Sequence, residues 1–246
     1  MTGMIAQCKA EILRTLRNRK FVVTALLMPA IFYFIFTSTM DANMNIGGIQ
    51  WKAYYLMSMT VFGVIGGSMN TISIRFAQER KQGWVQLLRI TPLPSGAYVF
   101  SKIAAQSVIN LGTIVFMFLI GGLFKGVELT FVQWLSCGLW IWIGILPFLA
   151  LGTLIGTIRS VEVVQVISQV IFIVMSALGG LWMPIQSMPS LMQHIAEWLP
   201  SYRYGQGAWN MVAGASPDWI GIVLLAAYAA VFMVLSSYRI KRQEAI

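Results

Sequence analysis

Long runs of apolar residues, separated by short polar or charged segments, dominate the pattern of this chain. A bilayer core of about 30 Å takes roughly 20 residues of helix, because each residue advances about 1.5 Å. Six stretches without a charge are long enough, so we predict six transmembrane helices. The fourth is longer than one crossing requires and is expected to be a single long or tilted helix. The predicted spans are approximately residues 21–40, 53–74, 103–124, 130–157, 163–181 and 218–238.

The uncharged stretch that begins at residue 163 is too long for one straight helix, so the fifth span must end inside it. Glycines and prolines predict that end near residue 181. Apolar residues then recur at helical spacing from Met188 to Leu199. We expect residues 182–217 to form short re-entrant helices in the outer leaflet, with a plain amphipathic surface loop as the alternative. The residues that mark this outer segment are Gly179, Gly180, Pro184, Pro189, Trp198, Pro200 and Tyr202.

Two further segments lie outside the predicted spans. Residues 1–20 carry apolar side chains at helical spacing among basic ones, which predicts an amphipathic helix in the membrane interface. A solvated basic leader is the alternative. Residues 75–102 form a charged connection in which Trp84, Leu87 and Leu88 make a small apolar patch, and Pro92 ends the short helix that carries it. Such a patch needs a cover, which could be a partner protein, the rest of the loop or lipid.

Composition supports a membrane protein and excludes other classes. Of the 246 residues, 58% are hydrophobic and 10% are charged, whereas an ordinary soluble domain has roughly 25% charged residues. So few charges could not cover the surface of a soluble domain of this size. The two cysteines, Cys8 and Cys137, fall at different depths of the predicted bundle and cannot form a disulfide framework. The predicted fold is therefore an all-α integral membrane domain.

The distribution of basic residues predicts the orientation in the membrane. The net charge is +9, from 17 Lys and Arg against 8 Asp and Glu. If the N-terminus is cytoplasmic, 14 of the 17 basic residues fall on cytoplasmic segments, whereas the acidic residues divide evenly. Such a bias in Lys and Arg alone is typical of membrane topology. We expect a multi-pass protein of the cell membrane with both termini in the cytoplasm, and no role in binding nucleic acid.

Candidate catalytic groups are few. His194 is the only histidine, which excludes a zinc site built on two histidines. No carboxylate falls in the middle of a predicted span, and the spans lack the buried charges that ion-coupled carriers use. The stretch from Gly96 to Lys102 approaches a phosphate-binding loop, but a serine replaces its second glycine. We therefore expect no catalytic site, no metal and no cofactor bound by this chain.

The order of these segments resembles the type-2 permease family of ABC exporters over essentially the whole chain. The most specific part is Glu79-Arg80-x-x-Gly83-x-x-x-Leu87-Leu88-x-x-x-Pro92, followed by Lys102, which is similar to the family's coupling helix. A second part, Gly179-Gly180-Leu-Trp-Met-Pro184 and then Leu199-Pro200 with Tyr202, is similar to its outer helical hairpin. Trp84 departs from the family's pattern, in which a small polar residue is common there.

The resemblance implies partners and a mechanism. A separate cytoplasmic ATPase subunit would bind ATP and Mg²⁺, and a second permease chain, identical or related, would complete a channel. ATP binding would move the coupling helix and switch the channel between inward-facing and outward-open or closed arrangements. The implied contact with the ATPase comprises the N-terminal helix together with Glu79, Arg80, Gly83, Trp84, Leu87, Leu88, Pro92, Arg159 and Glu162.

The predicted function is ATP-driven export of a lipophilic or amphipathic compound, such as a drug, an antibiotic or a lipid. Apolar spans without an identifiable polar pathway favour such a cargo. Two other classes stay open. A membrane sensor or assembly scaffold would use the apolar patch to hold a partner without transport. A membrane-embedded enzyme acting on lipids would need polar residues at one interface, and its candidates are His194, Glu197, Tyr202 and Arg203.

Overall fold

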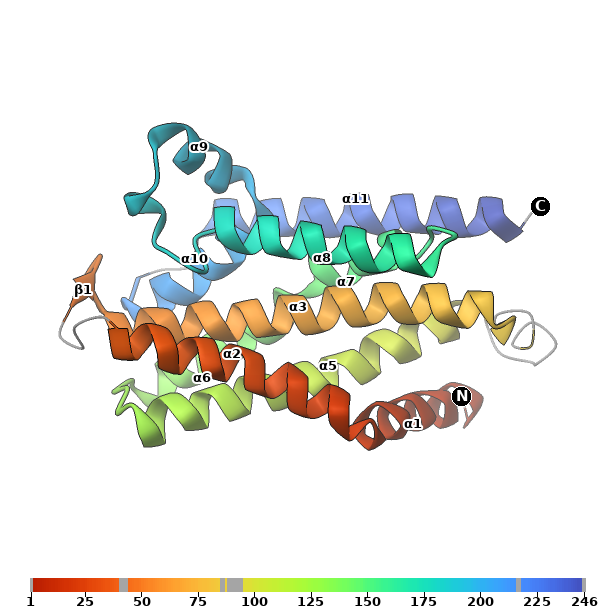
Figure 1. Cartoon of the computed structure of the whole chain (residues 1–246), viewed down its shortest axis with the longest axis horizontal. Helices are drawn as coiled ribbons and strands as arrows, with labels where there is room; N and C mark the ends of the chain where they lie inside the picture. Colours follow the sequence, from red (N-terminus) through yellow and green to blue (C-terminus); the bar gives the residue numbers. More distant parts are fainter. Residues whose placement is uncertain (1, 40–43, 85–86, 88–94, 216–217, 245–246) are drawn as a thin grey trace.

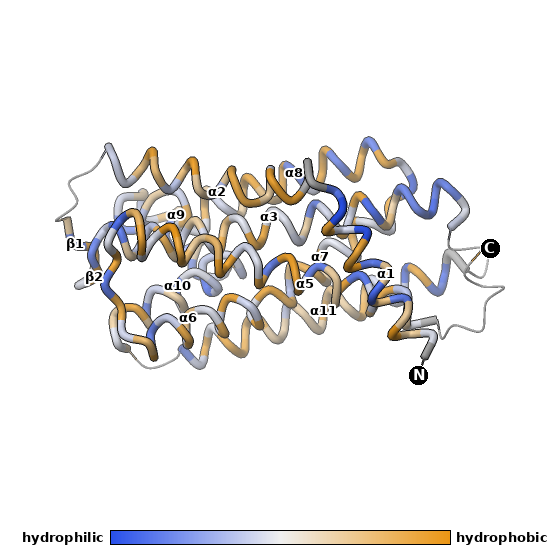
Figure 2. The backbone as a smooth tube through the Cα atoms, turned by 90° about the horizontal axis from the view of Figure 1, so that it is seen from below, coloured by the Kyte–Doolittle hydropathy of each residue, from blue (hydrophilic) through white to orange (hydrophobic). Residues whose placement is uncertain are grey.

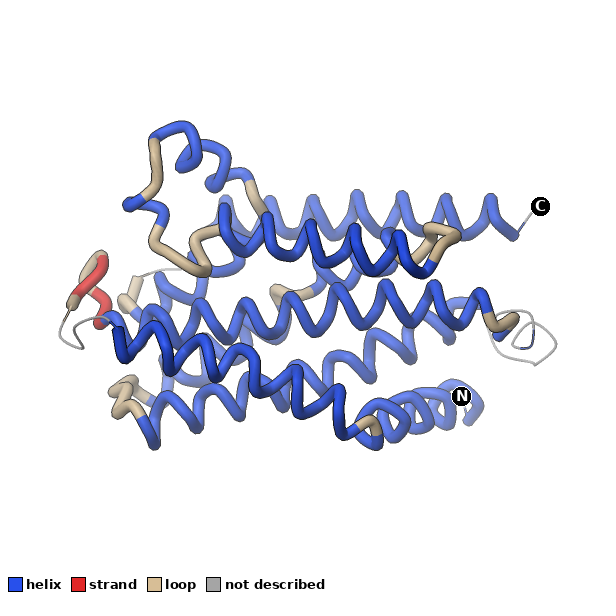
Figure 3. The backbone as a smooth tube through the Cα atoms, in the orientation of Figure 1, coloured by secondary structure: helices blue, strands red, loops and turns tan. Residues whose placement is uncertain are grey.

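The computed structural model describes residues 2–39, 44–84, 87, 95–215 and 218–244. These residues form an elongated bundle of helices, and both ends of the chain lie at the same end of the bundle (Figure 1). Helix accounts for most of the described backbone (Figure 3). The helices are α1 Thr2–Arg17, α2 Arg19–Thr39, α3 Trp51–Lys81, α5 Ser95–Leu119, α6 Phe131–Ile143, α7 Leu146–Ile155, α8 Val161–Leu178, α9 Ser190–Trp198, α10 Pro200–Val212 and α11 Trp219–Glu244.

Six of the helical segments are long and apolar enough to cross a membrane, which confirms the predicted number of spans. They are α2, α3, α5 with its π-helical end Ile120–Phe124, α6 with α7, α8, and α11. Many hydrophilic residues gather near the end that holds both termini, while hydrophobic residues follow the helices along the middle (Figure 2). The all-helical prediction is also confirmed. A two-stranded hairpin, β1 Asn45–Ile46 with β2 Ile49–Gln50, is the one addition among the described residues.

The connection between the second and third spans is shorter than predicted. Residues 75–81 continue α3 and residues 95–102 already belong to α5, so only residues 82–94 join the two helices. Charged residues are good helix formers, and nothing in residues 75–81 breaks the helix. Gly83 ends the helical conformation with a φ of +72°, and its N–H donates to the carbonyl of Arg80. A positive φ favours glycine at this position.

The fourth span is broken where one continuous helix was expected. α6 ends at Ile143 and α7 begins at Leu146, with Pro147 in its first turn. The break is stabilised by α10, because the Tyr204 hydroxyl donates to the carbonyl of Ile141. Gly144 allows this close approach, since a Cβ there would lie 2.8 Å from the Tyr204 ring. A side chain from outside the span thus satisfies a backbone group that the break leaves without a helical partner.

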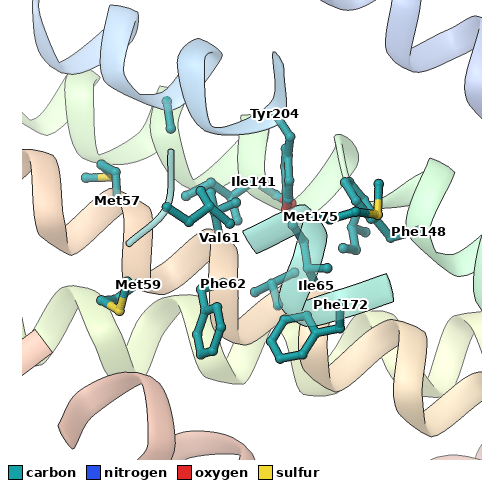
Figure 4. Close-up of a cluster of buried hydrophobic side chains, with 14 of the residues drawn as sticks. Met57, Met59, Val61, Phe62, Ile65, Ile141, Phe148, Phe172, Met175 and Tyr204 are labelled. Atoms are coloured by element: carbon teal, nitrogen blue, oxygen red, sulfur yellow. The ribbon is translucent and has the colours of Figure 1, made fainter. Parts of the chain in front are cut away.

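α3 forms the centre of the bundle. It packs against α2, α5, α7, α8 and α10, and 72% of its candidate span is buried. Methionine, aliphatic and aromatic side chains of α3 meet side chains of α6, α7, α8 and α10 in this core (Figure 4). The labelled members of this core are Met57, Met59, Val61, Phe62, Ile65, Ile141, Phe148, Phe172, Met175 and Tyr204. A helix packed on most of its faces can shift only together with its neighbours.

Small residues explain how closely α3 and α7 approach. Gly152 in α7 and Gly156, the C-cap residue of α7, lie one turn apart on a single face. A Cβ on Gly152 would lie 2.9 Å from the backbone oxygen of Met69, and one on Gly156 would lie 2.8 Å from Cβ of Phe76. These two glycines therefore serve packing within the chain.

Candidate functional site

Charged side chains from three helices meet at the end of the bundle that holds both termini. Lys102, near the start of α5, is 2% exposed, and its ammonium contacts two carboxylates. Lys102 Nζ lies 2.8 Å from Oε1 of Glu79 in α3 and 3.1 Å from Oε1 of Glu11 in α1. Both carboxylates are as deeply buried as the lysine. Together with three neighbours they form what we call the charge cluster: Glu11, Arg14, Arg75, Glu79, Tyr98 and Lys102.

The neighbours complete the hydrogen bonding of Glu79, whereas Oε2 of Glu11 is buried without a hydrogen-bond partner. Arg14 Nη1 lies 2.7 Å from Oε1 of Glu79, and the Tyr98 hydroxyl donates to Oε2 of Glu79 at 2.6 Å. Arg75 Nη1 lies 3.8 Å from Oε2 of Glu11. Buried carboxylates are tolerated when they are paired and hydrogen-bonded. Glu79, with Lys102, Arg14 and Tyr98 around it, meets that condition.

Helical spacing brings these side chains to facing surfaces. In each of the three helices the residues involved are four apart and so lie on the same side. α1 packs along α5, and α3 packs against α5. This cluster could not be predicted from the sequence, because its members lie in three separate segments and the spacing within each does not show that they meet. The pairs at this spacing are Arg75 and Glu79 in α3 and Tyr98 and Lys102 in α5. In α1, Glu11 lies four residues before Thr15, whose hydroxyl accepts from Arg75 Nη1 at 2.7 Å, and three residues before Arg14.

The predicted coupling residues have two different surroundings. Glu79 points into the charge cluster, whereas Arg80 donates through Nη2 to the backbone carbonyl of Ile158, between α7 and α8. Lys81 Nζ lies 3.7 Å from Oε1 of Glu162 in the first turn of α8, and both side chains are exposed. The end of α3 therefore contacts α1 and α5 on one side and the α7–α8 connection on the other.

The apolar patch of the connection is exposed where the structure describes it. Trp84 is 42% exposed and Leu87 is 54% exposed, just beyond the turn at Gly83. Arg159, in the α7–α8 connection, is exposed as well. Leu88 and Pro92, which belong to the same prediction, lie outside the described residues. Trp84 and Leu87 lie close together at the charged end of the bundle, which makes them a candidate surface for binding a partner.

The predicted outer segment builds the opposite end of the bundle. Gly179 follows α8 directly, and Gly180 turns the chain with a φ of +76°. Two short helices, α9 and α10, then occupy the segment in which short helices were predicted. Trp198 at the end of α9 is exposed, whereas Tyr202 in α10 is buried. The prolines mark element starts: Pro184 precedes the 3-10 turn Ile185–Ser187, Pro189 precedes α9, and Pro200 opens α10.

Of the four polar residues considered for a lipid-modifying site, Arg203 and His194 form local contacts through their side chains, Tyr202 is buried, and Glu197 is exposed. Arg203 pairs with Asp218, at 3.2 Å between Nη1 and Oδ2, and donates through Nε to the backbone carbonyl of Glu197. His194 Nδ1 lies 2.7 Å from the backbone oxygen of Ser190, one turn earlier in α9. Tyr202 is buried. Among the described residues, no group of three or more His, Cys, Asp and Glu could hold a metal ion.

Uncharged polar side chains meet between the spans, which the sequence analysis did not identify. The Ser68 hydroxyl of α3 and Gln106 Nε2 of α5 both donate to Oδ1 of Asn110, each at 3.0 Å. Nearer the surface of the chain, Asn70 Nδ2 donates to Gln169 Oε1 of α8 at 3.4 Å. These amides and hydroxyls give the spans some polar character without a charge.

Two comparisons relate the chain to known proteins. Residues 49–238 match the family described as "ABC-2 family transporter protein". Over 246 residues, and 100% of both chains, the sequence is 47% identical to a protein of Bacillus subtilis (strain 168) named "Putative transport permease YvfS". The family match runs from β2 through most of α11 and includes Glu79 and Lys102. The match to the Bacillus protein also covers α1, with Glu11 and Arg14.

Proposed function

Because this chain belongs to the ABC-2 family of transporter proteins, we propose that it is the permease of an ATP-driven exporter and that its charged end binds a separate ATPase. The observation that carries the proposal is the exposed pair Trp84 and Leu87, next to the end of a 31-residue helix that runs through the core. Aromatic and apolar side chains of this kind anchor protein–protein contacts. ATP and Mg²⁺ would be bound by the ATPase, and this chain would bind no cofactor.

The long helix α3 supports a mechanical role for that surface. A push on Trp84 and Leu87 would act on α3, whose packed core extends to α2, α5, α7 and α8. Arg80 and Lys81 would pass part of the same movement to the α7–α8 connection. Packed helices tend to switch between discrete arrangements. The proposed cycle moves the spans between inward-facing and outward-open or closed arrangements.

We assign the charged end to the cytoplasm. Both termini lie at this end, and the basic residues of α1, the end of α3 and the end of α11 gather there. Lys and Arg are enriched on cytoplasmic segments. In this orientation α1, which exposes Ile5, Leu13 and Leu16, lies along the inner interface as an amphipathic helix. At the other end, α9 exposes Leu191, Ile195 and Trp198, which suit a re-entrant position in the outer leaflet.

A second permease chain would explain the polar face of α8. Gln165 and Gln169 are exposed in the middle of an otherwise apolar helix. Amides that face hydrocarbon lose their hydrogen bonds, whereas glutamine can bond across a helix–helix contact in the membrane. We therefore place a second permease chain against α8, with Asn70 and Gln169 beside the path between the two chains.

Cross-linking through residue 169 is expected to join two copies of this chain. In a Cys8→Ala background, Gln169→Cys should form a disulfide-linked dimer on mild oxidation in membranes, because the same face meets itself across a two-fold axis. The matched control is Val223→Cys on the exposed face of α11, which should stay monomeric. Dimer formation by Val223→Cys alone would contradict the assignment to α8.

The cargo best suited to these spans is lipophilic or amphipathic. The polar groups found between the spans are uncharged, and the charges of the six membrane-spanning helical segments lie towards their ends. A charged or highly polar cargo would need compensating groups along its path. A drug, an antibiotic or a lipid could be bound largely through apolar contacts.

Reconstitution with a candidate ATPase subunit, to be sought in the neighbouring reading frames, tests the proposed function. Three probes cover the cargo classes: ethidium, a fluorescent peptide antibiotic and a fluorescent phospholipid. We expect ATP-dependent movement of at least one of them in proteoliposomes. The matched control is an ATPase whose catalytic glutamate is replaced by glutamine, which should move none. If the ATPase binds but no probe moves, the result would favour a membrane sensor or scaffold.

A further inference from the structure

Lys102 holds together three helices that are distant in the sequence. It contacts Glu11, 91 residues earlier in α1, and Glu79, 23 residues earlier in α3. The lysine side chain is 1% exposed and the two carboxylates are 4% and 3% exposed. Water screens such a buried contact far less than it screens the exposed pair of Lys81 and Glu162 at the same end of the bundle. Lys102 therefore links the three helices through buried ion pairs that solvent weakens very little.

Two carboxylates share one ammonium, so the loss of Lys102 would do more than remove a contact. Glu11 and Glu79 each place Oε1 within 3.1 Å of Lys102 Nζ. Without that nitrogen, two buried negative charges would lie near each other, and like charges at such range repel. Arg14 and Arg75 would offset only part of this repulsion, since the Arg14 side chain is 53% exposed and Arg75 Nη1 lies 3.8 Å from the nearer carboxylate oxygen of Glu11. The expected consequence is separation of α1 from α3 and α5.

The three helices that Lys102 links, α1, α3 and α5, connect to different parts of the permease. α3 continues towards Trp84 and Leu87, the proposed contact with the ATPase. α1 continues into α2 after the single residue Asn18, and α5 is itself the third span. Lys102 therefore lies where the proposed ATPase contact, the N-terminal helix and the first three spans meet.

We propose that Lys102 is a positioning residue that makes α1, the end of α3 and the start of α5 one rigid body, through which movement at the ATPase contact reaches the first three spans. This inference rests on the proposed function, because it requires an ATPase at Trp84 and Leu87. The sequence suggests two other roles for Lys102, as part of a phosphate-binding loop or as a basic residue that sets the membrane orientation. Neither of those roles requires a contact with α1 and α3. A lysine that only marked the cytoplasmic side would lie in water and would not need two buried partners.

The native cysteine of α1 reports on this contact without any ATPase. Cys8 lies one turn before Glu11 on the partly buried side of α1, and Cys137 is fully buried. In proteoliposomes, Lys102→Met should raise the rate of maleimide labelling at Cys8 by about 10-fold or more, because α1 separates more often. The matched control is Lys241→Met, which replaces an exposed lysine near the end of α11 and should leave the labelling rate at Cys8 unchanged. An unchanged rate in Lys102→Met would overturn the proposal.

The second measurement is the number of probe molecules moved per ATP hydrolysed, with the probe that the native chain transports. Lys102→Met should lower this ratio by about 10-fold while the ATPase still binds, because movement at the contact no longer reaches all three spans. A normal ratio together with faster Cys8 labelling would show that Lys102 only stabilises packing, which overturns the positioning role. If the native chain moves no probe, the proposed function fails and the positioning role fails with it, whatever the labelling shows.

A milder variant keeps the proposal testable if Lys102→Met does not accumulate in the membrane. Glu11→Gln leaves the contact of Lys102 with Glu79 intact and removes the negative charge through which α1 contacts Lys102. It should raise Cys8 labelling by about 3-fold and lower the transport ratio by a similar factor. Native values for both quantities in Glu11→Gln would contradict the proposal.

Discussion

Replacing Leu87 with aspartate is expected to lower ATP-driven export by about 100-fold, while the chain still inserts into the membrane. Leu87 is exposed in the isolated chain, so the substitution leaves the packed core unchanged. At a contact with the ATPase, an unpaired charge in an apolar environment costs about 3 kcal/mol, and each 1.4 kcal/mol is tenfold in affinity. The measurement is the affinity for the ATPase together with transport of the probe. Leu88→Asp, outside the described residues, is expected to act in the same direction.

The matched control for Leu87→Asp adds the same charge without removing an apolar side chain. Gln82 is exposed and polar, and Gln82→Asp should change ATPase affinity by less than about 3-fold. Equal losses in the two variants would mean that net charge matters and the apolar side chain does not. Full export by Leu87→Asp with the ATPase bound normally would contradict the assignment of the contact.

Replacing Glu79 with leucine is expected to destabilise the chain more than any change on its exposed surface. The substitution leaves the buried ammonium of Lys102 with Glu11 alone and removes the acceptor of Arg14 and Tyr98. Breaking a buried ion pair from one side costs about 3–5 kcal/mol, which corresponds to a fall in Tm of about 10 °C for a chain of this size. Thermal unfolding of the detergent-purified permease measures this change.

Two further variants separate the ion pair from other effects. Glu162→Leu breaks the exposed pair with Lys81 and should leave Tm nearly unchanged. The double variant Glu79→Leu with Lys102→Met removes both partners, so its loss should be smaller than the sum of the single losses by about 1–3 kcal/mol. Strict additivity would show that Glu79 and Lys102 do not interact in the folded protein.

The number of spans could be predicted because lipid imposes it on the sequence. Long apolar runs, such as the one that became α11, are needed to place backbone amides in hydrocarbon, and they can be read without tertiary information. The break between α6 and α7 could not be predicted in this way. Gly144 and Pro147 are tolerated within transmembrane helices, and the break depends on Tyr204, which lies far along the chain.

The exposed apolar part of the candidate site was predicted from the sequence, whereas its buried charge cluster was not. The apolar patch at Trp84 and Leu87 follows from local sequence alone, and its contact with an ATPase stays a prediction. The charge cluster depends on contacts between α1, α3 and α5, which sequence spacing can suggest but cannot pair. Glu79 was predicted as part of the ATPase contact, yet its side chain is 2% exposed. In this conformation it would act on the ATPase only through the helices that it joins.

Photo-cross-linking from the cytoplasmic end tests the central claim most directly. A photo-reactive amino acid at position 87 should cross-link to the ATPase in membranes that contain both subunits, because its side chain would lie in the contact. The same amino acid at position 191, exposed on α9 at the opposite end of the bundle, should give no such product. A cross-linked product from position 191, or none from position 87 in a complex that still hydrolyses ATP and moves its probe, would contradict the account.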